Sequence, residues 1–574
     1  MEYWVLEDKK TKEEWGIGGN ELKVNAPCSQ TIKSMVEKLE KEVCLKLEKL
    51  SFESYGSIFP RKEGFQELLN LISKTKSLRE LELNCVKNET GNEQEYLVDL
   101  VSCSPHFTSI EIQFRNGFPR ETKDKILESV FRNEKIERLL LTFGSSQQDT
   151  DLFERLAFMK SLKILKVDFS RTQISQEEAK KLFRAVEESK TITSFSVTNM
   201  MVCDFFGLEN NNTLEKLSLK FCKLSKADEI KFATFLSKNT SLKSLELLIQ
   251  IKESLIFNKN HFSGNNSITK LKIAANSCIK QLAEGVSFFV STNNNLRTLD
   301  LHRCGLREDA GMVLEAVRDT NSIKKLVLSG NYLGSEMDSK IAEMISKNES
   351  IEEIHLSGNP LSSCVQLFEA LKENKRIKVF DISNASLSMD EKNIPALSQV
   401  IVHNTSLTRL SLADNKAGKQ IVDIYRALSH NSTLKEVDVS KNLVEGEGRE
   451  ALVEMIAQNN SLKTVIANYT GISKRRHAEE LLEALEKNSC LTCFPLNLKT
   501  TFDKIQKGIN YQISLNVMIE QRDRHARVLM LALHRRRDGN VVSKLPRRLL
   551  IHLLSFVEIM RASKDELFSI TKKK

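Results

Sequence analysis

The sequence lacks the features of a membrane or exported protein. No stretch approaches 18 consecutive apolar residues, the length that a helix needs to cross a lipid core. The first ten residues, MEYWVLEDKK, do not have the basic and then apolar order of an export signal. Hydrophobic residues make up 40% and charged residues 28% of the chain, which is enough apolar mass to form a core. These features predict a folded, soluble protein.

Cysteine is present in a pattern that argues against a disulfide framework. The eleven cysteines are odd in number and scattered from Cys28 to Cys493, whereas small secreted domains carry paired cysteines at short spacings. We therefore expect reduced thiols and a cytoplasmic location.

Motifs of catalysis are also absent. The chain contains no glycine loop for phosphate, no H-E-x-x-H and no nucleophile elbow. Cys490 and Cys493 form a lone C-x-x-C, and zinc needs a second pair of ligands that the sequence does not supply. We expect no enzyme activity, no metal and no cofactor.

One segment recurs along almost the whole chain. It has apolar residues at relative positions 1, 4 and 6, as in NLRTLDL with Leu296, Leu299 and Leu301. The copies recur about every 28 residues, a spacing typical of repeat proteins. The seventeen copies have their first apolar residue at 47, 78, 107, 136, 162, 192, 214, 242, 268, 296, 323, 351, 377, 407, 434, 462 and 491.

Each unit has a strand half and a helical half. Positions 4 and 6 alternate with position 5, as expected of a strand with one buried side. The second half has helical spacing, as in Leu481, Leu482 and Leu485. A unit this short cannot bury its own apolar residues, so neighbours must stack strand beside strand and helix beside helix. Helices are wider than the separation of strands. The sequence therefore predicts a curved α/β solenoid with parallel strands on the concave face and helices on the convex face.

A further position supports this register. Five residues after position 4, the sequence often has asparagine or cysteine, whose side chain can hydrogen-bond the turn that follows the strand. Gln250, Ala385 and Thr470 depart from this pattern, and the position cannot be assigned in the first five units. The predicted ladder consists of Cys222, Asn276, Cys304, Asn331, Asn359, Asn415 and Asn442.

With these residues, the chain resembles the leucine-rich repeat family, and its strand-helix unit resembles the ribonuclease-inhibitor type. The resemblance covers residues 47 to about 498 and implies a horseshoe-shaped solenoid that binds another protein on its concave face. The subfamily includes GTPase-activating proteins and effectors that bacteria such as Legionella inject into host cells. A composition rich in Lys, Asn, Ile and Glu with only 8 prolines favours the effector branch, which would place the protein in the host cytoplasm.

The ends differ from the repeats. Residues 1–45 hold Trp4 and Trp15 and a helical pattern over 31–43, and we expect an N-terminal cap. Residues 46–498 hold the repeats. Residues 499–574 contain 17 Lys and Arg against 7 Asp and Glu. Their apolar spacing predicts a long helix and then a second one, which would form a basic helical C-terminal cap.

Three features leave alternatives open. The basic run from His534 to Arg537 is a solvated helix face or a contact for an anionic membrane surface, and we do not expect nucleic-acid binding because no aromatic platform accompanies it. The segment from Leu545 to Val557 resembles the first helix of an F-box, which would imply a ubiquitin-ligase substrate adaptor. Arg303 is the candidate arginine for a regulator of small GTPases.

Strand alternation also predicts the binding residues. Side chains beside position 4 point away from the helices, and in the later repeats they are mostly acidic, interrupted by Lys272, Lys325 and Arg409. A concave array of one charge concentrates the potential toward a docked surface. We therefore predict a protein partner with a basic patch, without defining its identity or the oligomeric state of the chain. The predicted contact residues are Asp300, His302, Glu353, His355, Asp381, Glu436 and Asp438.

Overall fold

The computed structural model divides into two compact units, Met1–Asn331 (unit 1) and Tyr332–Lys574 (unit 2). It describes residues 4–7, 14–18, 21–25, 48–53, 66, 69–70, 72–85, 95–103, 106–144, 151–169, 174–200, 208–222, 226–249, 265–275, 280–442, 446–469, 474–496 and 502–534.

Unit 1 is built on a sheet in which each strand pairs with the next along the chain. β1 and β2 pair antiparallel, as do β2 and β3. Parallel pairing begins with β3 and β4, where Leu22 lies opposite Leu50, so it starts before the predicted repeat boundary at residue 46. The strands are β1 (Trp4–Glu7), β2 (Glu14–Gly18), β3 (Glu21–Asn25), β4 (Lys49–Glu53), β5 (Glu80–Cys85), β6 (Ser109–Phe114), β7 (Arg138–Phe143), β8 (Ile164–Asp168), β9 (Ser194–Thr198), β10 (Lys216–Cys222), β11 (Ser244–Ile249), β12 (Lys270–Ala275), β13 (Thr298–Asp300) and β14 (Lys325–Val327).

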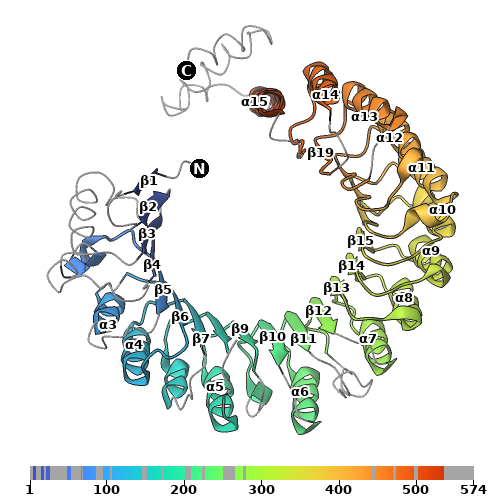
Figure 1. Ribbon diagram of the computed structural model, residues 1–574. Coiled ribbons are helices and arrows are strands. Elements are labelled where there is room, and N and C mark those ends of the chain that lie inside the picture. Colours follow the sequence, from blue (N-terminus) through green and yellow to red (C-terminus); the bar gives the residue numbers. More distant parts are fainter. Residues whose placement is uncertain are drawn as a thin grey trace. The chain divides into compact units, whose positions relative to one another are not determined.

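Helices cover one side of this sheet (Figure 1). They form because apolar residues recur at helical spacing behind a suitable N-terminus. In α5 (Gln176–Glu188), Ser175 and Glu178 make a capping box, and Leu182, Phe183 and Val186 are buried on the side that faces the sheet. The other helices of unit 1 are α3 (Glu95–Ser102), α4 (Arg120–Arg132), α6 (Lys226–Lys238), α7 (Lys280–Thr292) and α8 (Ala310–Arg318), with 3₁₀ turns at Asp151–Phe158, Leu208–Asn210 and Arg307–Asp309.

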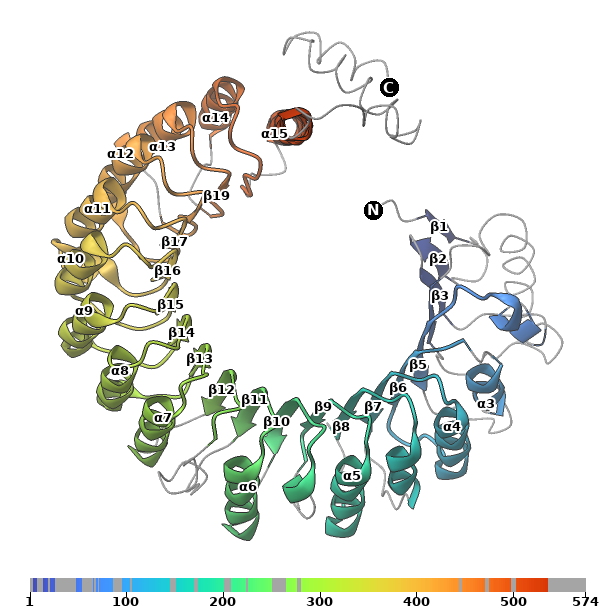
Figure 2. The same cartoon turned by 180° about the vertical axis from the view of Figure 1, so that it is seen from behind.

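Unit 2 repeats this arrangement with shorter strands. Its parallel strands again pair in chain order, with Ile354 opposite Phe380 and Leu410 opposite Val437. Within each unit the strands lie on the inner side and the helices on the outer side of a curved array (Figures 1 and 2). The elements are β15 (Glu353–His355), β16 (Val379–Asp381), β17 (Arg409–Ser411), β18 (Glu436–Asp438), β19 (Thr464–Ile466), α9 (Asp338–Lys347), α10 (Val365–Glu373), α11 (Asn393–His403), α12 (Ile421–His430), α13 (Glu447–Gln458), α14 (Arg475–Lys487) and α15 (Asp503–His534), with 3₁₀ turns at Ser335–Met337, Leu387–Met389 and Gly418–Gln420.

The core lies between strands and helices and consists of the predicted repeat positions. Position-4 residues from Leu50 to Val465 are at most 1% exposed, and position-6 residues such as Leu219 and Leu412 are equally buried. Each such leucine contributes about 1.5–3 kcal/mol by leaving water. The predicted α/β solenoid with parallel strands inside and helices outside is confirmed within each unit.

The early repeats close the end of the strand with aromatic rings instead of the predicted ladder. Phe143 stacks on Phe114 at a ring distance of 5.6 Å and on Phe169 at 5.5 Å. The Phe153 ring meets Phe143 edge-on at 6.0 Å. Phe114, Phe143 and Phe169 each lie one residue before the expected asparagine position, which is why the ladder could not be assigned there.

The long helix α15 packs against the last repeat of unit 2. Ile509 and Leu515 are buried, and the side chain of Asn516 donates to the carbonyls of Asn488 (2.9 Å) and Leu491 (2.8 Å). The first helix predicted for the tail therefore lies within Asp503–His534. The predicted second helix, with the Arg535–Arg537 run and the F-box-like segment, lies outside the described residues, as does the helix predicted over 31–43.

Candidate binding face of the sheet

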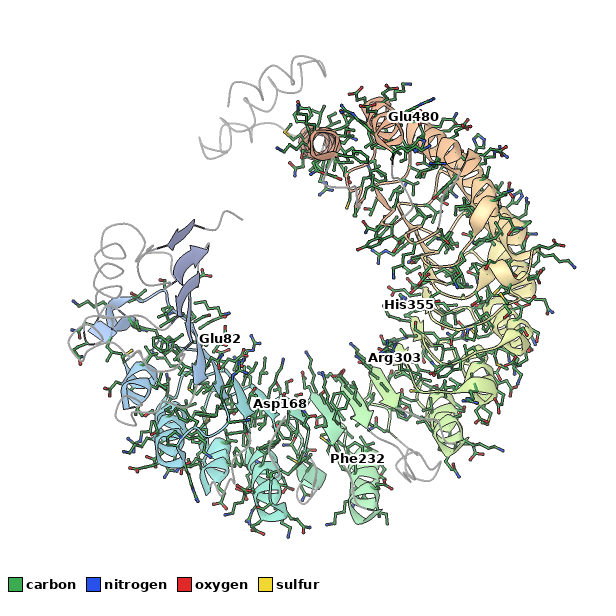
Figure 3. The ribbon with its side chains drawn as sticks, in the orientation of Figure 1. Glu82, Asp168, Phe232, Arg303, His355 and Glu480 are labelled. Carbon is green, nitrogen blue, oxygen red and sulfur yellow. The ribbon has the colours of Figure 1, made fainter. Side chains whose placement is uncertain are left out.

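The side of the sheet that no helix covers is the candidate site. In Figure 3, Glu82, Asp168 and His355 lie on the inner, strand side of their units, whereas Phe232 and Glu480 lie among the helices. Strand residues at positions 3, 5 and 7 are partly or fully exposed, as in the burial pattern of β6, where Ser109, Glu111 and Gln113 alternate with buried residues. The uncovered face can therefore present a surface determined by sequence, strand by strand.

The predicted contact residues divide between the two units. Asp300 and His302 belong to unit 1, and the other five residues belong to unit 2. Within unit 2, the register places His355 directly opposite Asp381, while Asp381 and Asp438 are separated by Ser411. The predicted contact residues thus form one set in unit 1 and another in unit 2.

His355 links two carboxylates in unit 2. Its Nδ1 lies 3.6 Å from an oxygen of Asp381, and its Nε2 lies 3.7 Å from an oxygen of Glu353. Burial would raise the pKa of Asp381. Its interaction with His355 and the N–H of Ser383 outweigh burial, so the pKa of this carboxyl lies below its usual value. Asp381 therefore carries its charge at neutral pH.

The remaining predicted residues of unit 2 leave an excess of negative charge. Arg409 lies 3.0 Å from Glu436 and neutralises it. Asp438 has no ion pair with a described residue. Across β15 to β18, the positions beside position 4 hold four carboxylates and one arginine, so this part of the face is acidic.

The three aspartates at position 5 also have a local structural role. The carboxylates of Asp300, Asp381 and Asp438 accept hydrogen bonds from the backbone N–H two residues later, at 3.1, 3.1 and 2.9 Å. This contact fixes the turn after each strand. A test of their charge must therefore keep the acceptor, which asparagine does and lysine does not.

In unit 1, Asp300 and His302 lie beside a lysine-rich network. Glu246 lies 3.1 Å from the Lys220 ammonium and 3.0 Å from that of Lys272, and it accepts a hydrogen bond from Ser218 at 2.8 Å. Burial, followed by the charge of Arg303, lowers the pKa of His302. Asp300, the one predicted acidic contact residue of unit 1, therefore lies beside cations.

A shallow hollow of about 390 Å³ opens on the face of unit 1 over β6 to β11. It exists because β9 presents only the short side chains Ser194, Ser196 and Thr198 to this face, while its neighbours carry Lys166 and Lys216. The sequence contains these short residues, but it did not predict the hollow. The hollow forms only where the side chains of adjacent repeats come together.

The predicted ladder residues lie buried at the end of the strands. The Asn415 side chain donates to Ile382 O at 2.9 Å and accepts from Ala385 N at 2.8 Å. Asn331, Asn359 and Asn442 make the same kinds of contact with backbone groups of the turn. The Cys222 and Cys304 thiols donate to carbonyls of the preceding repeat at 3.7 and 3.2 Å. Asn276 lies outside the described residues.

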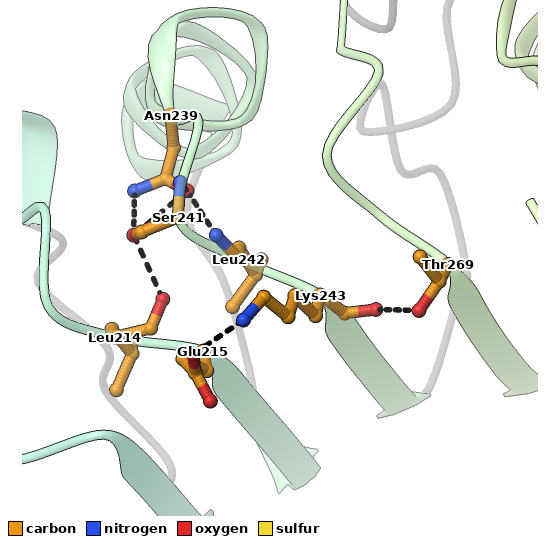
Figure 4. A network of polar contacts seen from close by, with 7 residues as sticks. All are labelled: Leu214, Glu215, Asn239, Ser241, Leu242, Lys243 and Thr269. Atoms are coloured by element: carbon orange, nitrogen blue, oxygen red, sulfur yellow. Dashed lines mark hydrogen bonds and ion pairs between the residues drawn. The ribbon is translucent and has the colours of Figure 1, made fainter. Parts of the chain in front are cut away.

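A second row of asparagines lies at the other end of the strands, three residues before position 1. Asn239 donates to Asn211 O at 2.8 Å. Its side-chain oxygen accepts from Leu242 N at 2.7 Å (Figure 4). Asn404 and Asn459 do the same, so their N-x-S/T patterns serve the fold. The recurrence of asparagine three residues before position 1 indicated a polar turn. It did not show that each asparagine side chain hydrogen-bonds the preceding repeat as well as its own.

Arg303 lies at the rim of unit 1, in the turn after β13. Its backbone is left-handed, with φ 55°, and its side chain is exposed. The next repeat has Gly330 at the same turn position, with φ 68°, and an added Cβ there would lie 3.0 Å from Cγ of Arg303. The stem of Arg303 thus crosses over a glycine that leaves room for it.

The described part of the chain lacks two other kinds of site. None of its helices is long and apolar enough to cross a membrane. No group of three or more His, Cys, Asp or Glu side chains there is arranged to hold a metal ion. The described cysteines, which include Cys490 and Cys493, are free thiols.

Comparison with known proteins gives partial matches. A leucine-rich repeat model matches residues 430–453. The mouse NACHT, LRR and PYD domains-containing protein 4C is 23% identical over 70% of this chain and 37% of that protein. The Dictyostelium discoideum Rho GTPase-activating protein gacW is 22% identical over 64% of this chain and 32% of its own length. The chain thus spans about a third of these relatives.

Two further similarities cover less of the chain. Human capping protein, Arp2/3 and myosin-I linker protein 3 is 27% identical over 40% of this chain and 14% of that protein. The crystal structure of the leucine-rich repeat-containing protein LegL7 from Legionella pneumophila covers 48% of this chain and 93% of its own, at 15% identity and a TM-score of 0.34. The repeated strand, the buried apolar positions and the two asparagine rows define the fold of each unit as an α/β leucine-rich repeat solenoid.

Proposed function

We propose that this chain is a protein-interaction module of the ribonuclease-inhibitor-like type, which binds a partner protein on the uncovered sheet face. The acidic residues of unit 2 would hold a basic patch of that partner. We further propose a cytoplasmic protein, acting in host cytoplasm as a bacterial effector. The observation that carries the proposal is the set of Glu353, Asp381 and Asp438, which lie on a sheet face that the helices leave uncovered.

Charged residues on an exposed face add little to the stability of the fold, but they can attract a partner of opposite charge. An exposed ion pair contributes at most about 1 kcal/mol to folding. A carboxylate on a curved sheet instead attracts a basic partner and raises the rate of association. Asp381 stays ionised at neutral pH because its pKa is held below the usual value.

The test uses the full chain as bait in eukaryotic cytosol, with cross-linking and mass spectrometry to locate contacts. The D381N/D438N variant keeps both backbone acceptors and removes two charges. We expect the specific partner to be lost or strongly reduced with this variant, and its cross-links in the wild type to fall on unit 2.

A matched control removes two charges from the helical side of the same unit. Glu343 pairs with Lys347 at 2.7 Å, and Glu369 pairs with Lys372. The E343Q/E369Q variant should retain the partner. Capture that is unchanged with D381N/D438N would refute the sheet face of unit 2 as the site.

A second candidate function is the regulation of a small GTPase. It is favoured by Arg303, whose exposed side chain extends from a left-handed turn at the rim of the sheet, and a match to a protein named as a Rho GTPase-activating protein agrees with it. An arginine supplied to a GTPase stabilises the charge of the transition state and raises the rate by orders of magnitude. Purified protein should then accelerate GTP hydrolysis by a Rho or Ran GTPase, and R303A should abolish that effect. A lack of acceleration by the wild type would reject this candidate.

A further inference from the structure

The N-terminal ends of strands β10 to β14 carry a concentration of positive charge, of which the predicted binding face included only Lys325. The first residue of each of these strands and the residue before it are 215–216, 243–244, 269–270, 297–298 and 324–325. The one carboxylate among them is Glu215, which lies 2.5 Å from the Lys243 ammonium. The cations form what we call the basic edge: Lys216, Lys243, Lys270, Arg297, Lys324 and Lys325.

Strand register places three of these lysines in one row. Lys216 lies opposite Ser244, which lies opposite Lys270, and Thr298 then separates Lys270 from Lys325. Strands lie about 4.8 Å apart, so successive lysines of the row are roughly 9.6 Å apart. The residues between them, Ser244 and Thr298, are short and polar.

Two lysines of this row, Lys216 and Lys270, are available to a ligand. Lys216 and Lys270 are exposed and have no ion pair or side-chain hydrogen bond with a described residue. The carboxylate of Glu246, on the strand between them, is already held by Lys220 and Lys272. Asp300 follows Thr298 and accepts the backbone N–H of His302. Like charges in a row repel one another, so an anionic ligand would relieve an unfavourable arrangement.

We propose that the basic edge binds an extended acidic segment of a partner protein, with a carboxylate at every third residue. An extended polyproline II chain rises about 3.1 Å per residue and has three residues per turn, so residues i, i+3 and i+6 project from one side about 9.3 Å apart. This spacing matches the lysine row. Because Ser244 and Thr298 have short side chains, the backbone of an extended segment can lie close to the sheet. A helical segment is wider, so its backbone would lie farther from the sheet.

The hollow beside Lys216 extends the same surface. It is lined by Ser194 and Ser196, whose hydroxyl groups can donate hydrogen bonds to a carboxylate or to a peptide carbonyl. A segment that leaves the row at Lys216 can therefore continue over the hollow. This inference concerns unit 1 and goes beyond the proposed function, which concerns the carboxylates of unit 2.

The test measures fluorescence anisotropy of labelled peptides with the full chain at low salt. The first peptide contains Glu-Pro-Pro three times. The second has the same composition, with three consecutive glutamates followed by six prolines. The third is a helical peptide with glutamates seven residues apart, and an oligothymidylate of ten nucleotides tests for nucleic acid.

The proposal expects the first peptide to bind most tightly, and its binding to weaken as salt rises. K216S/K270S should weaken it roughly three- to thirtyfold, as expected for the loss of two exposed ion pairs. K190S/K238S removes two exposed lysines from unit 1 outside the sheet and should leave binding unchanged, as should D381N/D438N in unit 2. Circular dichroism verifies that each variant is folded.

Three results would overturn the proposal. Equal affinity for the first two peptides would mean that the basic edge recognises the total charge of a peptide and not the spacing of its glutamates. Tighter binding of the helical peptide or of oligothymidylate would assign a different occupant. Undiminished binding by K216S/K270S would place the peptide elsewhere, and none of these results bears on the site in unit 2.

Discussion

Replacing Asn459 tests the structural logic of the asparagine row. Its amide donates to Leu428 O at 2.7 Å and to Asn431 O at 2.9 Å, and its oxygen accepts from Ser461 N and Leu462 N, both at 2.8 Å. The side chain is 2% exposed. A leucine of similar size would remove all four contacts.

The four contacts do not have equal cost. Leu428 O keeps a bond from Asn431 N at 3.2 Å, and Asn431 O keeps one from the Ser461 hydroxyl at 2.9 Å. The N–H groups of Ser461 and Leu462 are left with no acceptor. A buried donor without a partner costs about 1–3 kcal/mol. N459L should therefore lower the free energy of unfolding by about 2–6 kcal/mol.

A serine provides the matched control, because the repeat at β9 already has one. The Ser189 hydroxyl accepts from both Thr191 N and Ile192 N at 3.3 Å. N459S should keep an acceptor for the two amides and cost less than about 2 kcal/mol. Urea unfolding followed by far-UV circular dichroism gives both values, and hydrogen exchange should show faster exchange of the Ser461 and Leu462 amides in N459L. Equal destabilisation by leucine and serine would refute the assignment of the cost to these two donors.

Three further predictions follow from other contacts. F143A should destabilise unit 1 by about 3–5 kcal/mol, because the ring lies between Phe114 and Phe169, and a loss below 1 kcal/mol in urea unfolding would mean that the stack is dispensable. D381N keeps the acceptor for Ser383 N and loses only charge. Because the folded pKa of Asp381 is lowered, the wild type should be more stable than D381N above the ordinary carboxyl pKa of about 3.9, and the difference should vanish as the pH falls through the folded pKa. A difference that persists at pH 2 would contradict this. N516A should increase hydrogen exchange in α15 and leave β15 to β17 protected, since Asn516 donates to two carbonyls of the last repeat, whereas uniform exchange along unit 2 would show that the cap does not unfold separately.

The sequence alone determined the repeating unit of this protein. Positions 1, 4 and 6 could be read because a strand with one buried side must alternate, and those residues are the buried core. The asparagine ladder of the later repeats and the long helix within 503–534 followed in the same way from local pattern. These features depend on residues within one repeat, so the spacing of apolar and polar residues along the sequence is enough to predict them.

Tertiary structure decided everything that depends on adjacent repeats. The stack of Phe114, Phe143 and Phe169 replaces the ladder because rings roughly 30 residues apart come to lie about one strand spacing from each other. The pairing of charges on the sheet face depends on adjacent repeats in the same way. Arg409 neutralises Glu436 across two strands, and lysines from alternate strands align into the basic edge. Register between repeats determines which charges meet, and no single repeat contains that information.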